Sequence, residues 1–283
     1  GCSPAGVQYT IQAGETDADG ISIEANTLAL NSGTIRDAAG NNATITYSSV
    51  SANTSYKVDT TAPSVDNFTL SDTALKAGDN ATVTLRFSEA VVSFSSAADI
   101  TADNGTLAAM SSADNITWTG TFTPTANTED ASNTLSLATS YTDTAGNAGP
   151  AATTENYAVE TLAPTVNSVA ISSASGVQNS LLNAGDNVSV TATFSESVIV
   201  DNASGTPTLT LVVGSDNRTA TYTSGSGSTP LVFQYTIQAG DNDTNGISIE
   251  ANTLALNSGT IRDAAGNNAT ITYSSVSANT SYK

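Results

Sequence analysis

Histidine is absent from the chain, and cysteine occurs only once, as Cys2. Histidine is the commonest general base and the commonest transition-metal ligand, so its absence argues against both kinds of site. A single cysteine excludes a disulfide within the chain and argues against a redox role or a cysteine-bound zinc. We therefore expect a protein that is not an enzyme.

Basic residues and long apolar runs are also scarce. Seven Lys and Arg stand against 26 Asp and Glu, which gives a net charge of −19. Such a chain repels nucleic acids and anionic lipids. No apolar run approaches the roughly 20 residues of a membrane span, and the first residues lack the charged and apolar regions of a signal peptide. We expect neither nucleic-acid binding nor direct membrane insertion, and any secretion signal would lie outside this sequence.

The residues that are abundant favour β-structure. Val, Ile, Thr and Tyr recur between turns rich in Gly, Asn and Asp. Val83, Leu85 and Phe87 alternate with polar residues, which predicts a strand with one buried face. Roughly seven short strands in about 100 residues are typical of an immunoglobulin-like sandwich. Besides residues 81–87, we predict strands at residues 116–122, 134–141, 156–160, 188–194, 208–213, 220–223, 231–239, 253–257 and 269–273.

The chain repeats itself. Residues 1–57 align without a gap on residues 227–283, and residues 20–57 are identical to residues 246–283. Two similar phrases, each ending in Ala-Pro at Pro63 and Pro164, indicate joints between modules. We predict an incomplete long module at 1–57, a short module at 58–163 and a complete long module at 164–283.

The incomplete module lacks the front strands that residues 164–226 supply to the long module. We therefore expect residues 1–57 not to fold alone. Either they are a piece of a longer array, the interpretation we favour, or they borrow the missing strands from a neighbouring molecule.

Several motifs recur in a fixed order. Ala-Gly-Asp-Asn opens a strand at residues 77–80 and 184–187, and Phe-Ser-Glu ends it at 87–89 and 194–196. An Asp-x-x-Gly-Asn phrase follows later in each module, as at 143–147. The chain thereby resembles the bacterial immunoglobulin-like extender repeats of giant secreted calcium-dependent adhesins, often of the RTX type. The resemblance implies an all-β fold of tandem immunoglobulin-like sandwiches arranged end to end, outside the cell at the bacterial surface, with calcium at or near the joints.

Strand directions also bring acidic residues together, independently of the resemblance. If the first strand of a module runs away from the joint, the next strand returns to it and carries Glu89 there. The turn between the last two strands lies at the same end. Carboxylate, amide and backbone oxygens suit Ca²⁺, which takes six to eight oxygen ligands. The predicted ligands at the first joint are Asp59, Glu89, Asp143 and Asn147.

The same argument applies to the second joint and to the incomplete module. The predicted ligands at the second joint are Glu160, Glu196, Asp263 and Asn267, with Asp79 approaching from the preceding module. The matching turn of residues 1–57 adds Asp37 and Asn41. The alternative is that Asp and Asn occupy these turns only because their side chains bond to nearby backbone groups.

We expect a structural extender segment of a bacterial cell-surface adhesin or surface filament, made rigid by calcium at the joints. Its partners would be neighbouring repeats of the same chain, or copies of itself in a filament. The alternative is a ligand-binding module in which loops of the long domain, around residues 205–229, recognise a glycan or a protein.

Overall fold

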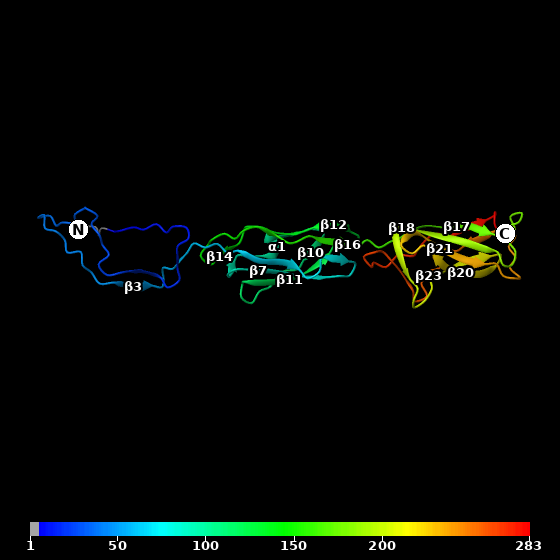
Figure 1. Ribbon diagram of the computed structural model, residues 1–283, viewed down its shortest axis with the longest axis horizontal. Coiled ribbons are helices and arrows are strands. Elements are labelled where there is room, and N and C mark those ends of the chain that lie inside the picture. The colour runs from blue at the N-terminus through cyan, green and yellow to red at the C-terminus, as the bar shows by residue number, and fades with distance from the viewer. Residues whose placement is uncertain (1–5) are drawn as a thin grey trace.

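The computed structural model describes residues 6–283, so the predictions made for Cys2 and for the first residues lie outside it. Three parts follow one another along the longest axis (Figure 1): an N-terminal segment, a middle unit and a C-terminal unit. The middle and C-terminal units each have a hydrophobic core of their own. Within residues 6–283, no helix reaches the length and hydrophobicity needed to cross a membrane.

The middle unit is built of two layers of strands. One layer is an antiparallel sheet in the order β10-β11-β7-β5. The other contains the sets β12-β16-β6, β15-β13-β9 and β14-β8, with β16 parallel to β6. The bounds are β4 Val58–Asp59, β5 Val65–Leu70, β6 Ala74–Lys76, β7 Ala81–Phe87, β8 Val91–Val92, β9 Ile100–Ala102, β10 Gly105–Leu107, β11 Thr117–Pro124, β12 Glu129–Asn133, β13 Leu135–Leu137, β14 Thr142–Asp143, β15 Ala152–Thr153 and β16 Tyr157–Glu160, with a single-turn helix α1 at Ser96–Asp99.

Alternation along β7 determines the core of the middle unit. Val83, Leu85 and Phe87 are fully buried, whereas the residues between them face outward or are half-buried. Phe87 packs on Tyr141, whose ring centroid lies 4.9 Å away. Burying each large apolar side chain stabilises the fold by about 1.5–3 kcal/mol. The predicted all-β class is confirmed, and α1 is a short exception.

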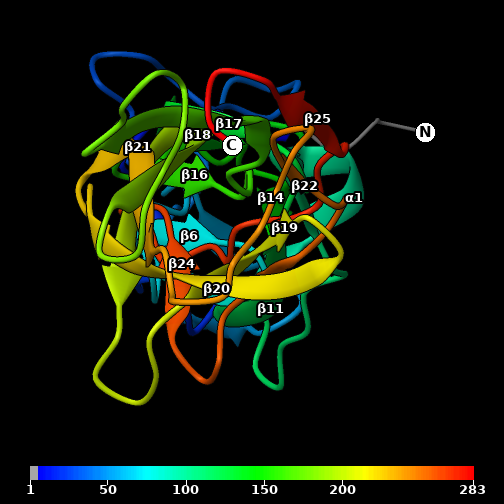
Figure 2. The ribbon, with the colours of Figure 1, turned by 90° about the vertical axis from the view of Figure 1, so that its right-hand side faces the viewer.

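The C-terminal unit is a curled sheet of nine strands. Its order is β17-β18-β21-β20-β19-β22-β25, with β23 paired to β19 and β24 paired to β18. Figure 2 looks along the long axis with this unit nearest the viewer, and its strands wrap around the core as a near-barrel. The bounds are β17 Val166–Ser175, β18 Asn187–Asp201, β19 Thr208–Val213, β20 Asp216–Ser224, β21 Ser228–Thr236, β22 Ile247–Ile249, β23 Leu254–Ala255, β24 Thr260–Arg262 and β25 Val276–Asn279.

Several strands of this unit differ in their bounds from the sequence prediction, and two differ most. We expected one strand to end at Glu196, but β18 passes through a bulge and continues to Asp201. Its last residues, rich in Val and Ile, pair with β24. The predicted strand at 269–273 is absent from the structure. The backbone there makes separate hydrogen bonds instead of pairing as a strand. Thr270 N donates to Pro164 O, and Tyr273 N donates to the Asn252 side chain.

The N-terminal segment, residues 6–57, contains β1 (Thr16–Asp17), β2 (Ile21–Ile23) and β3 (Val50–Asn53). Strand β1 pairs with β4, the short strand at the joint before the middle unit, and β2 pairs with β3. The segment contributes to neither hydrophobic core. Its apolar side chains are exposed, including those of Ile21, Ile23 and Ile35.

Candidate functional site

Three carboxylates converge at the joint between the N-terminal segment and the middle unit. Asp59 ends β4, Glu89 follows β7, and Asp143 ends β14. One oxygen of each carboxylate lies within 4.8 Å of the others. Two oxygens bound to one Ca²⁺ at about 2.4 Å can be at most about 4.8 Å apart. The geometry therefore fits a hard cation, with backbone oxygens or water completing the shell.

The turn after β14 holds Asp143 as an anion. Its Oδ1 accepts hydrogen bonds from three backbone N–H groups, at 2.8, 2.7 and 2.9 Å, in the turn that ends at Asn147. Gly146 supplies the left-handed backbone conformation, with φ of 97°. Burial by itself would raise the pKa of the Asp143 carboxyl, but the hydrogen bonds outweigh it and hold the pKa below its ordinary value.

Asn147 fastens the joint strand to this turn. Its Nδ2 donates to Asp143 Oδ2 at 2.7 Å and to the carbonyl oxygens of Asp59 and Thr61 at 3.2 Å each. The side-chain nitrogen thus faces the joint, whereas a metal ligand would have to present its oxygen. In this arrangement Asn147 positions the carboxylates, which differs from the ligand role predicted for it.

Among residues 6–283, no group donates a comparable set of hydrogen bonds to Glu89. Burial, followed by the negative charges of Asp143 and Asp59, raises the pKa of Glu89. Like charges at this distance repel one another, and a divalent cation between them would remove the repulsion. The donor set of three carboxylates is the chemistry that Ca²⁺ prefers.

The second joint gathers four acids. Glu160 ends β16, Glu196 lies in β18, Asp263 follows β24, and Glu129 begins β12. Burial raises the pKa of both Glu160 and Glu196, and the surrounding carboxylates raise both further. Asp263 is buried and accepts bonds from Gly266 N at 2.6 Å and Asn267 N at 2.8 Å. This joint thus repeats the hydrogen-bonded Asp beside partly buried Glu side chains, but among the described residues the approach of three carboxylates to within 4.8 Å occurs at the first joint alone.

Glu129 was missed by the sequence analysis. It lies directly opposite Glu160 in the β12–β16 pair, where like charges are destabilising. At the first joint Thr16 occupies the corresponding position opposite Asp59. Only the pairing of β12 with β16 brings Glu129 to the joint, and nothing in its local sequence indicates that pairing.

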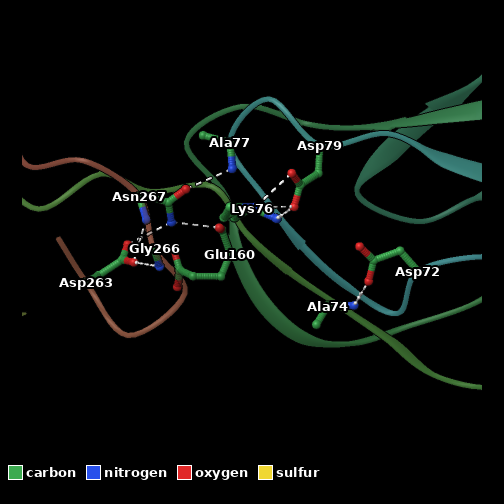
Figure 3. Close-up of polar contacts among 9 residues, drawn as sticks. All are labelled: Asp72, Ala74, Lys76, Ala77, Asp79, Glu160, Asp263, Gly266 and Asn267. Atoms are coloured by element: carbon green, nitrogen blue, oxygen red, sulfur yellow. Dashed lines mark hydrogen bonds and ion pairs between the residues drawn. The ribbon is translucent and has the colours of Figure 1, made fainter.

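Asn267 links the two units directly (Figure 3). Its Nδ2 donates to Asp263 Oδ2 at 2.7 Å and to Glu160 O at 2.8 Å. Its Oδ1 accepts from Ala77 N of the middle unit at 2.8 Å. Both the nitrogen and the oxygen of the side-chain amide are therefore hydrogen-bonded, and Asn267 connects the two units.

The remaining predicted ligands lie apart from the clusters. The Asp79 carboxylate is turned toward Lys76 (Figure 3), which binds it through Nζ at 2.8 Å and through the backbone N at 3.1 Å. The prediction that Asp79 joins this joint as a ligand is not met in this arrangement. Asp37 and Asn41 form the same turn as Asp143 and Asn147, but on the exposed N-terminal segment.

Comparison with known families assigns a domain to the middle unit. Residues 59–159 match the family described as "Bacterial Ig-like domain". A solved structure of FdeC, described as a novel, broadly conserved Escherichia coli adhesin eliciting protection against urinary tract infections, is similar over 84% of this chain and 70% of that chain, with 15% identity and a TM-score of 0.35. No curated protein matches the chain. The chain is thus an all-β protein with a bacterial Ig-like domain at residues 59–159, followed by a near-barrel β-sheet.

Proposed function

We propose that the chain is an extender segment of a bacterial cell-surface adhesin or surface filament, in which Ca²⁺ at the joints holds successive immunoglobulin-like modules in line. The convergence of Asp59, Glu89 and Asp143 at a joint is the observation that carries the proposal. The three side chains come from the joint strand and from two separate places in the middle unit. A cation bound to all three would fix the joint to the module that follows it.

Charge explains why a cation would matter here. The net charge of −19 makes successive modules repel, and at the second joint the acids Glu129 and Glu160 of the middle unit lie beside Glu196 and Asp263 of the C-terminal unit. Ca²⁺ would replace that local repulsion with shared coordination, while charge elsewhere keeps the array extended and soluble. Modules that contact mainly their neighbours gain length by addition, which suits a spacer.

The proposed location is outside the cell. Extracellular calcium modules bind with dissociation constants of about 0.1–1 mM, which suits millimolar calcium. At about 1 mM calcium, a site with a dissociation constant of about 0.1 mM would stabilise the folded state by about 1.4 kcal/mol. The bacterial Ig-like domain at residues 59–159 supports a surface location.

Thermal unfolding tests the proposal. Calcium should raise the melting temperature of the middle unit, and chelator should reverse the rise, because only the folded state assembles the three carboxylates. Glu89→Gln should abolish most of the calcium effect. Glu155→Gln, which removes an equal charge from an exposed position of the same unit away from the three carboxylates, should leave the effect intact. Equal melting curves in calcium and chelator for the unmodified chain would refute the cation at this joint.

A further inference from the structure

The N-terminal segment presents an apolar face whose identical counterpart is buried in the C-terminal unit. Ile21 and Ile23 are 44% and 48% exposed, whereas Ile247 and Ile249, which occupy the same places in the repeat, are 1% exposed each. Ile35 shows the same contrast with Ile261, at 46% against 1%. The sequence of residues 20–57 is identical to that of residues 246–283, so the difference lies only in what covers them.

The segment already has the local conformation of the covered copy. Its pair Ile21↔Asn53 matches Ile247↔Asn279 in register. Asn26 and Asn252 both have φ of 59°. The same side-chain bonds recur too: Thr27 N donates to Tyr47 Oη at 3.0 Å, as Thr253 N does to Tyr273 Oη. The apolar face of the N-terminal segment therefore already has the backbone conformation that its identical copy adopts when packed in a core.

The cover in the C-terminal unit comes from residues outside the repeated part. Strand β19 pairs with β22 and β23, and β18 pairs with β24. Thr253 Oγ1 also donates to Thr210 O of β19 at 3.1 Å. Both covering strands belong to residues 164–226, of which residues 6–57 hold no equivalent.

In the described part of the chain, the first joint has no counterpart of the hydrogen bond that Ala77 N donates at the second joint. At the second joint Asn267 Oδ1 accepts from Ala77 N, which belongs to an Ala-Gly-Asp-Asn turn. Within residues 6–283, Asn147 Oδ1 accepts no such bond, and an open groove of about 640 Å³ lies beside it, lined in part by Thr144 and Ala145. The long module has the same turn at residues 184–187. The missing donor would therefore be supplied by Ala184 of a second long-module front.

We propose that the apolar face of residues 6–57 binds a second copy of residues 164–226, placed ahead of residue 1, and that the turn of this copy completes the first joint through Asn147 Oδ1. The inference does not depend on a cation at either joint. It also specifies the order of the array, since a complete long module then precedes each short one.

Exchange of strands between two molecules of this chain is the less favourable source of the copy. Residues 164–226 of a neighbour are already paired with its own residues 227–283. Phe233 is fully buried in that pairing, whereas Val7 occupies its place in residues 1–57. A swap would therefore exchange a larger core for a smaller one.

The test is to join residues 58–226 ahead of residue 1 of the full chain, so that the middle unit with its own core leads the added strands. Hydrogen exchange at Ile21, Ile23 and Val50 should slow by about 100-fold or more relative to the chain without the addition. The matched control carries Leu209→Asp and Leu211→Asp in the added copy only. Both leucines are fully buried in the C-terminal unit, so the control should show no slowing.

Protection at Ile247 and Ile249 serves as the internal reference for a folded long module in each sample. Exchange at Ile21 and Ile23 that stays as fast as in the unextended chain would overturn the proposal. Equal slowing in the control would overturn it too, because the protection would then not require the packing of β19.

Discussion

Individual carboxylates at the joints fall into two kinds. Asp143 and Asp263 are buried, but each accepts several hydrogen bonds from its own turn. Glu89, Glu160 and Glu196 are partly buried beside other acids, and the pKa of each is raised. The hydrogen bonds keep Asp143 ionised, whereas burial and the neighbouring acids make the charged form of the Glu side chains costly, a cost that a cation would offset.

This division predicts how stability depends on pH without calcium. The three Glu side chains bind protons more tightly in the folded state than at their ordinary pKa of 4.5. Stability should therefore rise as the pH falls through their raised pKa values toward 4.5. Below 3.8 it should fall, because Asp143 loses the ionised form that its turn stabilises. Urea unfolding from pH 7 to pH 3 in chelator measures the profile. A steady loss of stability from pH 7 downward would contradict it.

Asn267 offers a second prediction at the residue scale. Asn267→Ala removes the bonds to Ala77 N and Glu160 O and should destabilise the C-terminal unit by about 1–3 kcal/mol, because buried polar groups lose their partners. The control is Asn41→Ala, in the same turn sequence on the exposed segment, which should change stability by less than about 0.5 kcal/mol. Chemical unfolding compares the two, and equal effects would mean that the link between units contributes nothing.

At the scale of elements, the repeat provides a matched pair of substitutions. Ile247→Ala should cost about 2–5 kcal/mol, because it leaves a cavity in the core of the C-terminal unit. Ile21→Ala changes the identical residue of β2 and should cost little, since its side chain is exposed. Denaturant unfolding followed for each unit would show the contrast. A comparable loss for both would mean that the N-terminal segment has a core in solution.

Strands with strict alternation were predictable from the sequence, and those held by side chains or bulges were not. Strand β19 has the predicted bounds, because its apolar residues alternate between turns. The continuation of β18 depends on β24, more than 50 residues later in the chain. Asp59, Glu89 and Asp143 could be placed together because strand direction determines which loops share an end. The position of Glu129 depends on the pairing of β12 with β16, and the direction of the Asp79 carboxylate depends on its contact with Lys76. Strand direction determines neither of them.

In the whole molecule, two contributions to the second joint differ in their physical basis. The link through Asn267 needs no ion, and it joins the middle and C-terminal units through hydrogen bonds. The proposed calcium acts on the repulsion among acids around that link. Chelator should therefore loosen the second joint without separating it fully, and Asn267→Ala in chelator should loosen it further.

The central claim, that calcium holds the modules in line, is tested most directly by the distance distribution across the second joint. Spin labels at Thr121 and Thr219, both exposed, would report it by pulsed dipolar spectroscopy after Cys2→Ser removes the native thiol. The account predicts one narrow distribution in millimolar calcium and a broader one in chelator. Distributions of the same width and mean in both conditions would contradict the claim.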